Sequence, residues 1–137
     1  PGRSPGRLTL IARMGADNAP RRLPALVKAV ARAGHPVLWL SDPMHGNTVS
    51  GPDGLKTRLV ETVVREVQAF QEAVRAGGGV AAGLHLETTP EAVTECVSDS
   101  VELHRIGDKF TAAGAGGLVP APAGQWTYTT LALGSAL

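Results

Sequence analysis

Ionisable side chains follow three short apolar runs, at the point where each run ends. Arg13 ends the first run, Asp42 and His45 follow the second, and His85 and Glu87 end the third. Side chains of these types bind anions, hold metal ions or transfer protons. If the runs are neighbouring strands of one parallel sheet, their ends meet at the same edge. We therefore expect these five side chains to share one site.

Arg13 has two interpretations. It forms either a structural ion pair with Asp17 or Asp42, or a clamp for a phosphate or carboxylate group. The second interpretation is chemically reasonable because a guanidinium presents a planar fork of donors that matches such anions. The sequence alone leaves both open.

His45 and Glu87 are candidate metal ligands. A neutral imidazole and a carboxylate supply half of a mixed nitrogen and oxygen site suited to Mn, Fe, Co or Zn. A lone histidine in a turn-rich loop is more often structural, so the metal interpretation requires Glu87 to reach His45. Because His85 alternates with Glu87, both are expected on the same side of their strand, with His85 beside the metal site or inside a barrel.

The elements that must position these residues alternate between strand and helix patterns. Apolar runs predict strands at 8–13, 36–40 and 80–87. Helical spacing of apolar residues predicts a first helix, capped by Asp17 or Asn18 with Pro20 in its first turn, that continues to Gly34.

A second, longer helix is predicted at about 54–76, closed by three glycines at 77–79. Lys56 would lie at its start, where a lysine is unfavourable with the helix dipole, although a solvated surface lysine is the simpler interpretation. A short helix is expected to begin at Thr89-Pro90-Glu91.

This alternation predicts an α/β fold with a parallel sheet, either a barrel or an open doubly wound sheet. A closed (β/α)8 TIM barrel needs eight units and typically about 250 residues, so the three units visible here form only a partial barrel. The chain from Phe110 to Leu137 has no charged residue and no helical period. It is therefore expected to be an irregular tail.

The composition excludes several classes of function. The 137 residues carry 13 basic and 12 acidic side chains and only 4% aromatics, with no basic run that would track nucleic acid. No stretch approaches the roughly 20 apolar residues that span a bilayer, and the first residues lack the apolar region of a secretory signal. Cys96 is the single cysteine and cannot form an internal disulfide. We expect a cytoplasmic protein that binds neither nucleic acid nor membrane.

Five segments resemble the C-terminal half of the type II (plant-like) 3-deoxy-D-arabino-heptulosonate 7-phosphate (DAHP) synthases. They are "PGRLTLIARMGAD" (5–17), "GHPVLWLSDPMHGNT" (34–48), "GLKTR" (54–58), "GLHLETTPEAVTEC" (83–96) and "ELHRIGDKFTA" (102–112). They occur in the family's order, and "DPMHGNT" is long enough to be specific. The resemblance divides the chain into a partial TIM-barrel domain at 1–112 and a divergent tail at 113–137.

The resemblance implies an enzyme that condenses phosphoenolpyruvate with erythrose 4-phosphate and releases phosphate, using a divalent metal such as Mn or Co. Such enzymes open the shikimate pathway to the aromatic amino acids. It further implies that Arg13 binds substrate phosphate and that His45 and Glu87 are metal ligands. Lys56 would be a catalytic residue close to the active site.

Part of the family pattern has no counterpart in this sequence. The family completes its metal site with a cysteine of the first barrel strand and an aspartate of a "CDPRLN" segment, whereas here "GDKFTA" is followed by "AGAGGLVPAPAG" and Cys96 lies in another motif. The alternative to an active synthase is therefore an inactive remnant, or a fragment that needs a second copy or a complementing subunit. An unrelated metal hydrolase would require more His and Asp ligands than the sequence has.

Overall fold

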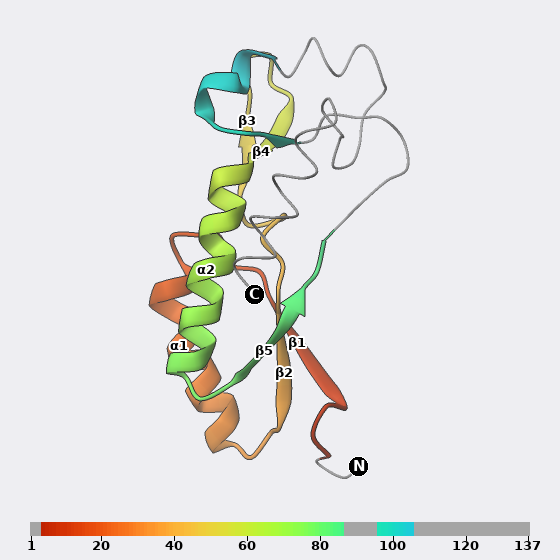
Figure 1. Ribbon diagram of the computed structural model, residues 1–137, viewed down its shortest axis with the longest axis vertical. Helices are drawn as coiled ribbons and strands as arrows, with labels where there is room; N and C mark the ends of the chain where they lie inside the picture. Colours follow the sequence, from red (N-terminus) through yellow and green to blue (C-terminus); the bar gives the residue numbers. More distant parts are fainter. Residues whose placement is uncertain (1–3, 87–95, 106–137) are drawn as a thin grey trace.

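The computed structural model describes residues 4–86 and 96–105 (Figure 1). In chain order the elements are β1 (Leu8–Ala12), α1 (Ala19–Arg32), β2 (Val37–Ser41), β3 (Thr48–Ser50), β4 (Lys56–Leu59), α2 (Val60–Ala76), β5 (Val80–Leu84), β6 (Cys96–Val97) and the 3-10 helix η1 (Ser100–Arg105). The predicted α/β class is confirmed.

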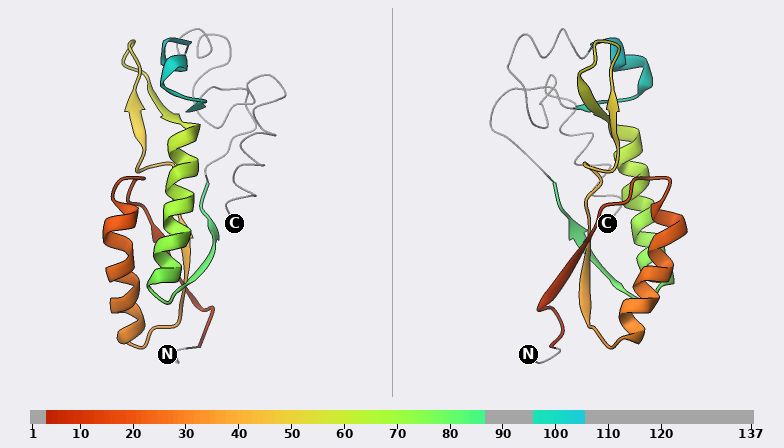
Figure 2. Two further views of the ribbon diagram at one scale, coloured as in Figure 1. Left: turned by 60° about the vertical axis from the view of Figure 1, so that its left-hand side comes forward. Right: turned by 180° about the vertical axis from the view of Figure 1, so that it is seen from behind.

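The three predicted strands form one parallel sheet in the order β1-β2-β5. The two helices that connect them, α1 and α2, pack against each other on the same face of this sheet (Figure 2). A second small sheet, β3-β4-β6, lies at the N-terminal end of α2 (Figure 1). Within the described part of the chain, the main sheet therefore has one face covered by helices and one face without them.

The core fills the space between this sheet and the two helices. Trp39 of β2 is its largest buried side chain, and Phe70 of α2 packs in the same cluster. Their partners include Leu23 and Val27 of α1, which recur at the helical spacing that the sequence shows. Each such side chain contributes about 1.5–3 kcal/mol when fully buried, so the core fixes where the ends of the strands lie.

Helix α1 begins and ends close to the predicted positions. Asn18 is its N-cap residue, a proline occupies the first turn, and Gly34 follows its end with a positive φ of 73°. The Asn18 side chain makes no capping hydrogen bond and instead donates to the Met14 carbonyl at 3.2 Å. The cap residue thus ties the helix to the loop that leaves β1.

The predicted start of the long helix is wrong. Residues 56–59 form β4, and α2 begins only at Val60. Thr57 is fully buried and pairs with Val49 of β3, while Arg58 pairs with Cys96 of β6. Hydrogen bonding on both sides therefore keeps this segment extended, and Lys56 lies on a strand rather than at a helix start.

The third strand is shorter than predicted, because β5 ends at Leu84 and His85 lies beyond it. Glu87, the short helix expected from Thr89, the domain boundary at 112 and the tail at 113–137 lie outside the described residues. Those expectations therefore stay predictions.

Close packing at Gly79 yields a test of the fold. A Cβ atom at this position would lie 2.8 Å from Val27 Cγ1 and 3.0 Å from Val74 Cγ1. We expect Gly79→Ala to lower the free energy of unfolding by about 1–3 kcal/mol in urea denaturation, because the core has no room for the methyl group. Val27→Ala removes the nearest clashing atom, so the double variant should lose less than the sum of the two single losses. Additive losses would contradict this packing.

Candidate functional site

The ends of the three main strands bring Arg13, Asp42 and His85 to one edge of the sheet. Ala12 pairs with Ser41 in the register, and the ladder continues beyond both strands. The Asp42 amide donates to the Ala12 carbonyl and the His85 amide donates to the Ser41 carbonyl, each at 2.8 Å. The expectation that the strand ends share an edge is therefore confirmed for these residues.

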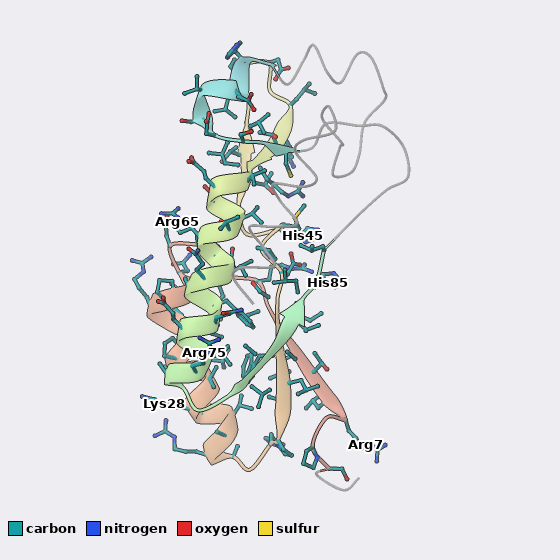
Figure 3. The ribbon with its side chains drawn as sticks, in the orientation of Figure 1. Arg7, Lys28, His45, Arg65, Arg75 and His85 are labelled. Carbon is teal, nitrogen blue, oxygen red and sulfur yellow. The ribbon has the colours of Figure 1, made fainter. Side chains whose placement is uncertain are left out.

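Figure 3 shows the same edge with side chains. His45 and His85 lie at this end of the sheet, whereas Arg7 lies at the opposite end, near the start of β1. His85 is half-buried. The candidate site thus occupies the carboxyl ends of parallel strands, which is where α/β folds place their chemistry.

Asp42 is the centre of the site. Its side chain is 0% exposed, and its Oδ2 accepts a hydrogen bond from Arg13 Nε at 2.7 Å. His45 Nδ1 lies 2.8 Å from Oδ2 and 3.0 Å from Oδ1. The amides of Met44 and His45 donate to Oδ1 at 3.1 and 3.2 Å. One buried carboxylate therefore holds an arginine, an imidazole and the turn that follows β2.

These contacts keep Asp42 ionised. Burial alone would raise its pKa, but the hydrogen bonds from the His45 ring and from the His45 and Met44 amides outweigh burial and lower the pKa below its usual value. An ionised carboxylate only accepts hydrogen bonds, so His45 Nδ1 carries the proton of this contact.

The pairing with Asp42 gives His45 the arrangement of a metal-binding histidine. Histidine ligands usually donate one ring N–H to a carboxylate, which orients the ring and leaves the lone pair on the other nitrogen. Here Nδ1 makes that bond, so the lone pair is on Nε2, and the side chain is 28% exposed. His45 therefore fits a ligand for a divalent cation.

Arg13 makes the structural ion pair, and its partner is Asp42 rather than Asp17. Asp17 instead pairs with Arg65, with Nη2 and Oδ1 at 3.2 Å. The Asp42 contact uses only Nε, and the Arg13 side chain is 54% exposed. The anion-clamp interpretation stays compatible with the ion pair, because the terminal nitrogens of an anchored guanidinium still offer donors to an anion.

Lys56 is exposed on β4 and pairs with Ser50 across the hairpin. Among the described residues no hydrogen bond or ion pair links Lys56 to Arg13, Asp42 or His45. Arg58 reaches the site instead, because its Nε donates to the Met44 carbonyl at 2.7 Å. Arg58 ends the family segment "GLKTR", and no role was predicted for it from the sequence.

Glu66 is a second buried acid that the sequence analysis missed. It lies on α2 and is 1% exposed, and its Oε1 accepts from the Gly15 amide at 3.0 Å. Its Oε2 accepts from Asn47 Nδ2. Glu66 lies three residues after Val63, one before Val67 and four before Phe70, and all three of these side chains are buried. An acid within an apolar helical stripe was the signal that would have found it.

The environment of Glu66 favours its neutral form more than that of Asp42 does. Burial raises its pKa above the usual value, the hydrogen bonds from Asn47 and the backbone offset only part of this increase, and the negative charge of Asp42 adds to it. The surroundings of the two acids thus shift their pKa values in opposite directions, downward for Asp42 and upward for Glu66.

The described residues supply only part of a metal site. No group of three or more His, Cys, Asp or Glu side chains in 4–86 and 96–105 is placed to hold a metal ion. His45 is the candidate that these residues contribute, and Glu87 lies outside them. Cys96 is half-buried and forms no disulfide.

Comparison with known proteins establishes the family. The model of the Class-II DAHP synthetase family matches residues 1–112. A probable phospho-2-dehydro-3-deoxyheptonate aldolase of Pseudomonas fluorescens is 60% identical over 110 residues, which cover 80% of this chain and 28% of that protein. A phospho-2-dehydro-3-deoxyheptonate aldolase of Streptomyces coelicolor is 47% identical over 103 residues, or 75% of this chain and 23% of that protein.

The chain belongs to the Class-II DAHP synthetase family, and the resemblance seen in the sequence is confirmed. It spans about a quarter of the length of the two curated relatives. Among the helices that the structure describes, none is long and apolar enough to cross a membrane.

The buried charge of Asp42 predicts a pH-dependent stability. Asp42→Asn should lower the free energy of unfolding at neutral pH by about 2 kcal/mol, because the contacts to Arg13 and His45 lose their charge. The folded pKa of Asp42 is lowered, so its contribution is present above the ordinary aspartate pKa and is lost as the pH falls through the folded pKa. The difference between wild type and variant in urea denaturation should therefore shrink in acid.

Asp53→Asn is the matched control, since Asp53 is exposed and should change stability by less than about 0.5 kcal/mol. An Asp42→Asn variant as stable as wild type at neutral pH would contradict the central role of this carboxylate.

Proposed function

We propose that this chain carries part of the active site of a DAHP synthase, which condenses phosphoenolpyruvate with erythrose 4-phosphate and releases phosphate at the entry to the shikimate pathway. Its family membership and the names of its relatives support the proposal. The structural observation that carries it is the buried Asp42, which holds Arg13 and His45 next to each other at the carboxyl ends of parallel strands.

Arg13 would bind a phosphate or carboxylate group of the substrates. Its guanidinium is anchored through Nε to Asp42, so the orientation of the terminal nitrogens is set before the anion arrives. Preorganisation of this kind lowers the entropic cost of binding and places charge where the phosphate oxygens lie. Lys56 would act as a further cation near the substrates, from the end of β4 that faces the hairpin turn.

His45 would hold a divalent metal, Mn or Co, through Nε2, with Glu87 as a second ligand. When bound, such a cation polarises a substrate carbonyl and so favours attack by the enol carbon of phosphoenolpyruvate. Asp42 keeps the His45 ring oriented and its Nδ1 protonated, which holds the lone pair on Nε2.

The sheet β1-β2-β5 would be a segment of a (β/α)8 barrel. Its parallel strands are adjacent in the order in which they occur along the chain, and both connecting helices cover the same face. Successive strands and helices of a barrel are arranged in this way, whereas a doubly wound sheet has helices on both faces. The face without helices would then be the barrel interior. The expected cytoplasmic location stays a prediction.

A partner-dependent fragment is the second candidate function. Apolar side chains on the main sheet are unusually exposed, including Ile11 at 46% and Val80 at 58%. Outer edges of β1 and β5 have no strand partner among the described residues. Exposed apolar strands and open edges favour association, so a second copy or a complementing subunit would cover them.

Turnover tests the synthase proposal directly. We expect the chain, with Mn or Co and both substrates, to consume phosphoenolpyruvate, measured as loss of the ultraviolet absorbance of the enol. His45→Ala should reduce the rate by more than about a hundredfold. His35→Ala is the control, because His35 is exposed and precedes β2 at the opposite end of the strand. Turnover that survives His45→Ala would contradict the role of His45.

Mixing distinguishes the second candidate from the first. If the chain depends on a partner, adding the preceding half of a relative's barrel should raise the helical circular dichroism above the sum of the separate spectra and restore turnover. Full turnover by the chain alone, or a spectrum equal to the sum, would count against partner dependence.

A further inference from the structure

We propose that Glu66 and Asn47 are positioning residues that together fix the distance between Arg13 and His45. This inference rests on the proposed function only for the roles of Arg13 and His45. Neither Glu66 nor Asn47 contacts these two side chains in the hydrogen bonds that the structure shows for the described residues. Glu66 and Asn47 act instead on the two loops that carry Arg13 and His45.

Asn47 joins the two loops directly. Its Oδ1 accepts from the Ala16 amide at 3.0 Å, which belongs to the loop after β1. Its Nδ2 donates to the Pro43 carbonyl at 2.8 Å, within the loop after β2. The second proton of Nδ2 is donated to Glu66 Oε2. Every polar atom of this buried amide is therefore engaged, and its orientation is fixed.

Glu66 joins the same two loops to helix α2. One carboxylate oxygen accepts from the Gly15 amide and the other from Asn47. Gly15 is two residues after Arg13, and Asn47 is two residues after His45. A shift of Glu66 would therefore move both loops, and with them the two candidate site residues.

The backbones of the two loops also touch. A Cβ atom on Gly46 would lie 2.5 Å from the Gly15 nitrogen, and one on Gly15 would lie 2.8 Å from the Gly46 carbonyl oxygen. Two side chains cannot be accommodated between the loops, so both positions require glycine. The contact makes the loops one rigid unit, with Asp42 linking them on one side and the Glu66–Asn47 pair on the other.

Exchange of the two functional groups tests the inference. In Glu66→Gln the one remaining side-chain oxygen has to accept from the Gly15 amide. The new amide nitrogen then faces Asn47 Nδ2, and two donors oppose each other. In Asn47→Asp two carboxylates face each other. The double variant restores one hydrogen bond in the reverse direction, from the new amide at position 66 to the new carboxylate at position 47. The carboxylate at position 47 still opposes the Pro43 carbonyl, to which Nδ2 donates in wild type. We therefore expect the double variant to recover the link to α2 but not the contact with Pro43.

The measurement is ¹H–¹⁵N NMR of the Arg13 Nε–H and His45 Nδ1–H groups in the full chain. We expect both signals to shift or be lost through solvent exchange in each single variant and to return in part in the double variant. Val74→Ala is the control, because it removes core volume in the last turn of the same helix and should lower stability without moving these signals.

Unchanged signals in folded Glu66→Gln would overturn the inference, and so would equal changes in Val74→Ala. If a single variant does not fold, the double variant decides: a folded protein that retains both signals supports the inference, and loss of either signal overturns it. Cobalt titration is a separate measurement. Glu66→Gln should weaken cobalt binding by about tenfold, whereas wild type that binds no cobalt would contradict the proposed metal role and leave the NMR result valid.

Discussion

The site depends on the charge of Asp42, a carboxylate without exposed surface. An unpaired buried charge is strongly unfavourable, so the fold has to surround Asp42 with donors. It does so with Arg13 from the preceding strand end, the ring of His45 and two amides of the turn after β2. Arg13 and His45 come from separate parts of the chain and are neighbours because both contact this one buried acid.

Two acids hold the strand ends in different ways. Asp42 has its pKa lowered by donors and anchors the side chains that we assign to substrate and metal. Glu66 has its pKa raised by burial and anchors the backbone of the loops. The loops between them meet at Gly15 and Gly46 without space for side chains. The site is thus rigid on both sides, as a preorganised site requires.

Much of the fold was predictable because its signals are local. The helical spacing of Leu23 and Val27 and the apolar strand runs depend only on neighbours in sequence, and the shared edge of Arg13, Asp42 and His85 follows from parallel strands. The start of α2 was mispredicted because Thr57 and Arg58 are held extended by strands distant in sequence. Glu66 was missed because a single acid among the apolar residues of an amphipathic helix is easily taken for an ordinary exception to the hydrophobic periodicity. Glu87 is outside the described residues, so its role stays a prediction.

The central claim is that Asp42 couples Arg13 to His45. A double-mutant cycle of Arg13→Ala and His45→Ala, measured as the free energy of unfolding in urea, tests it most directly. Counting partners among residues 4–86 and 96–105, each single variant leaves Asp42 one charged or ring partner, whereas the double variant leaves only backbone amides. The double loss should therefore exceed the sum of the single losses by about 0.5–3 kcal/mol. Additive losses would mean that the two residues are independent and would contradict the account.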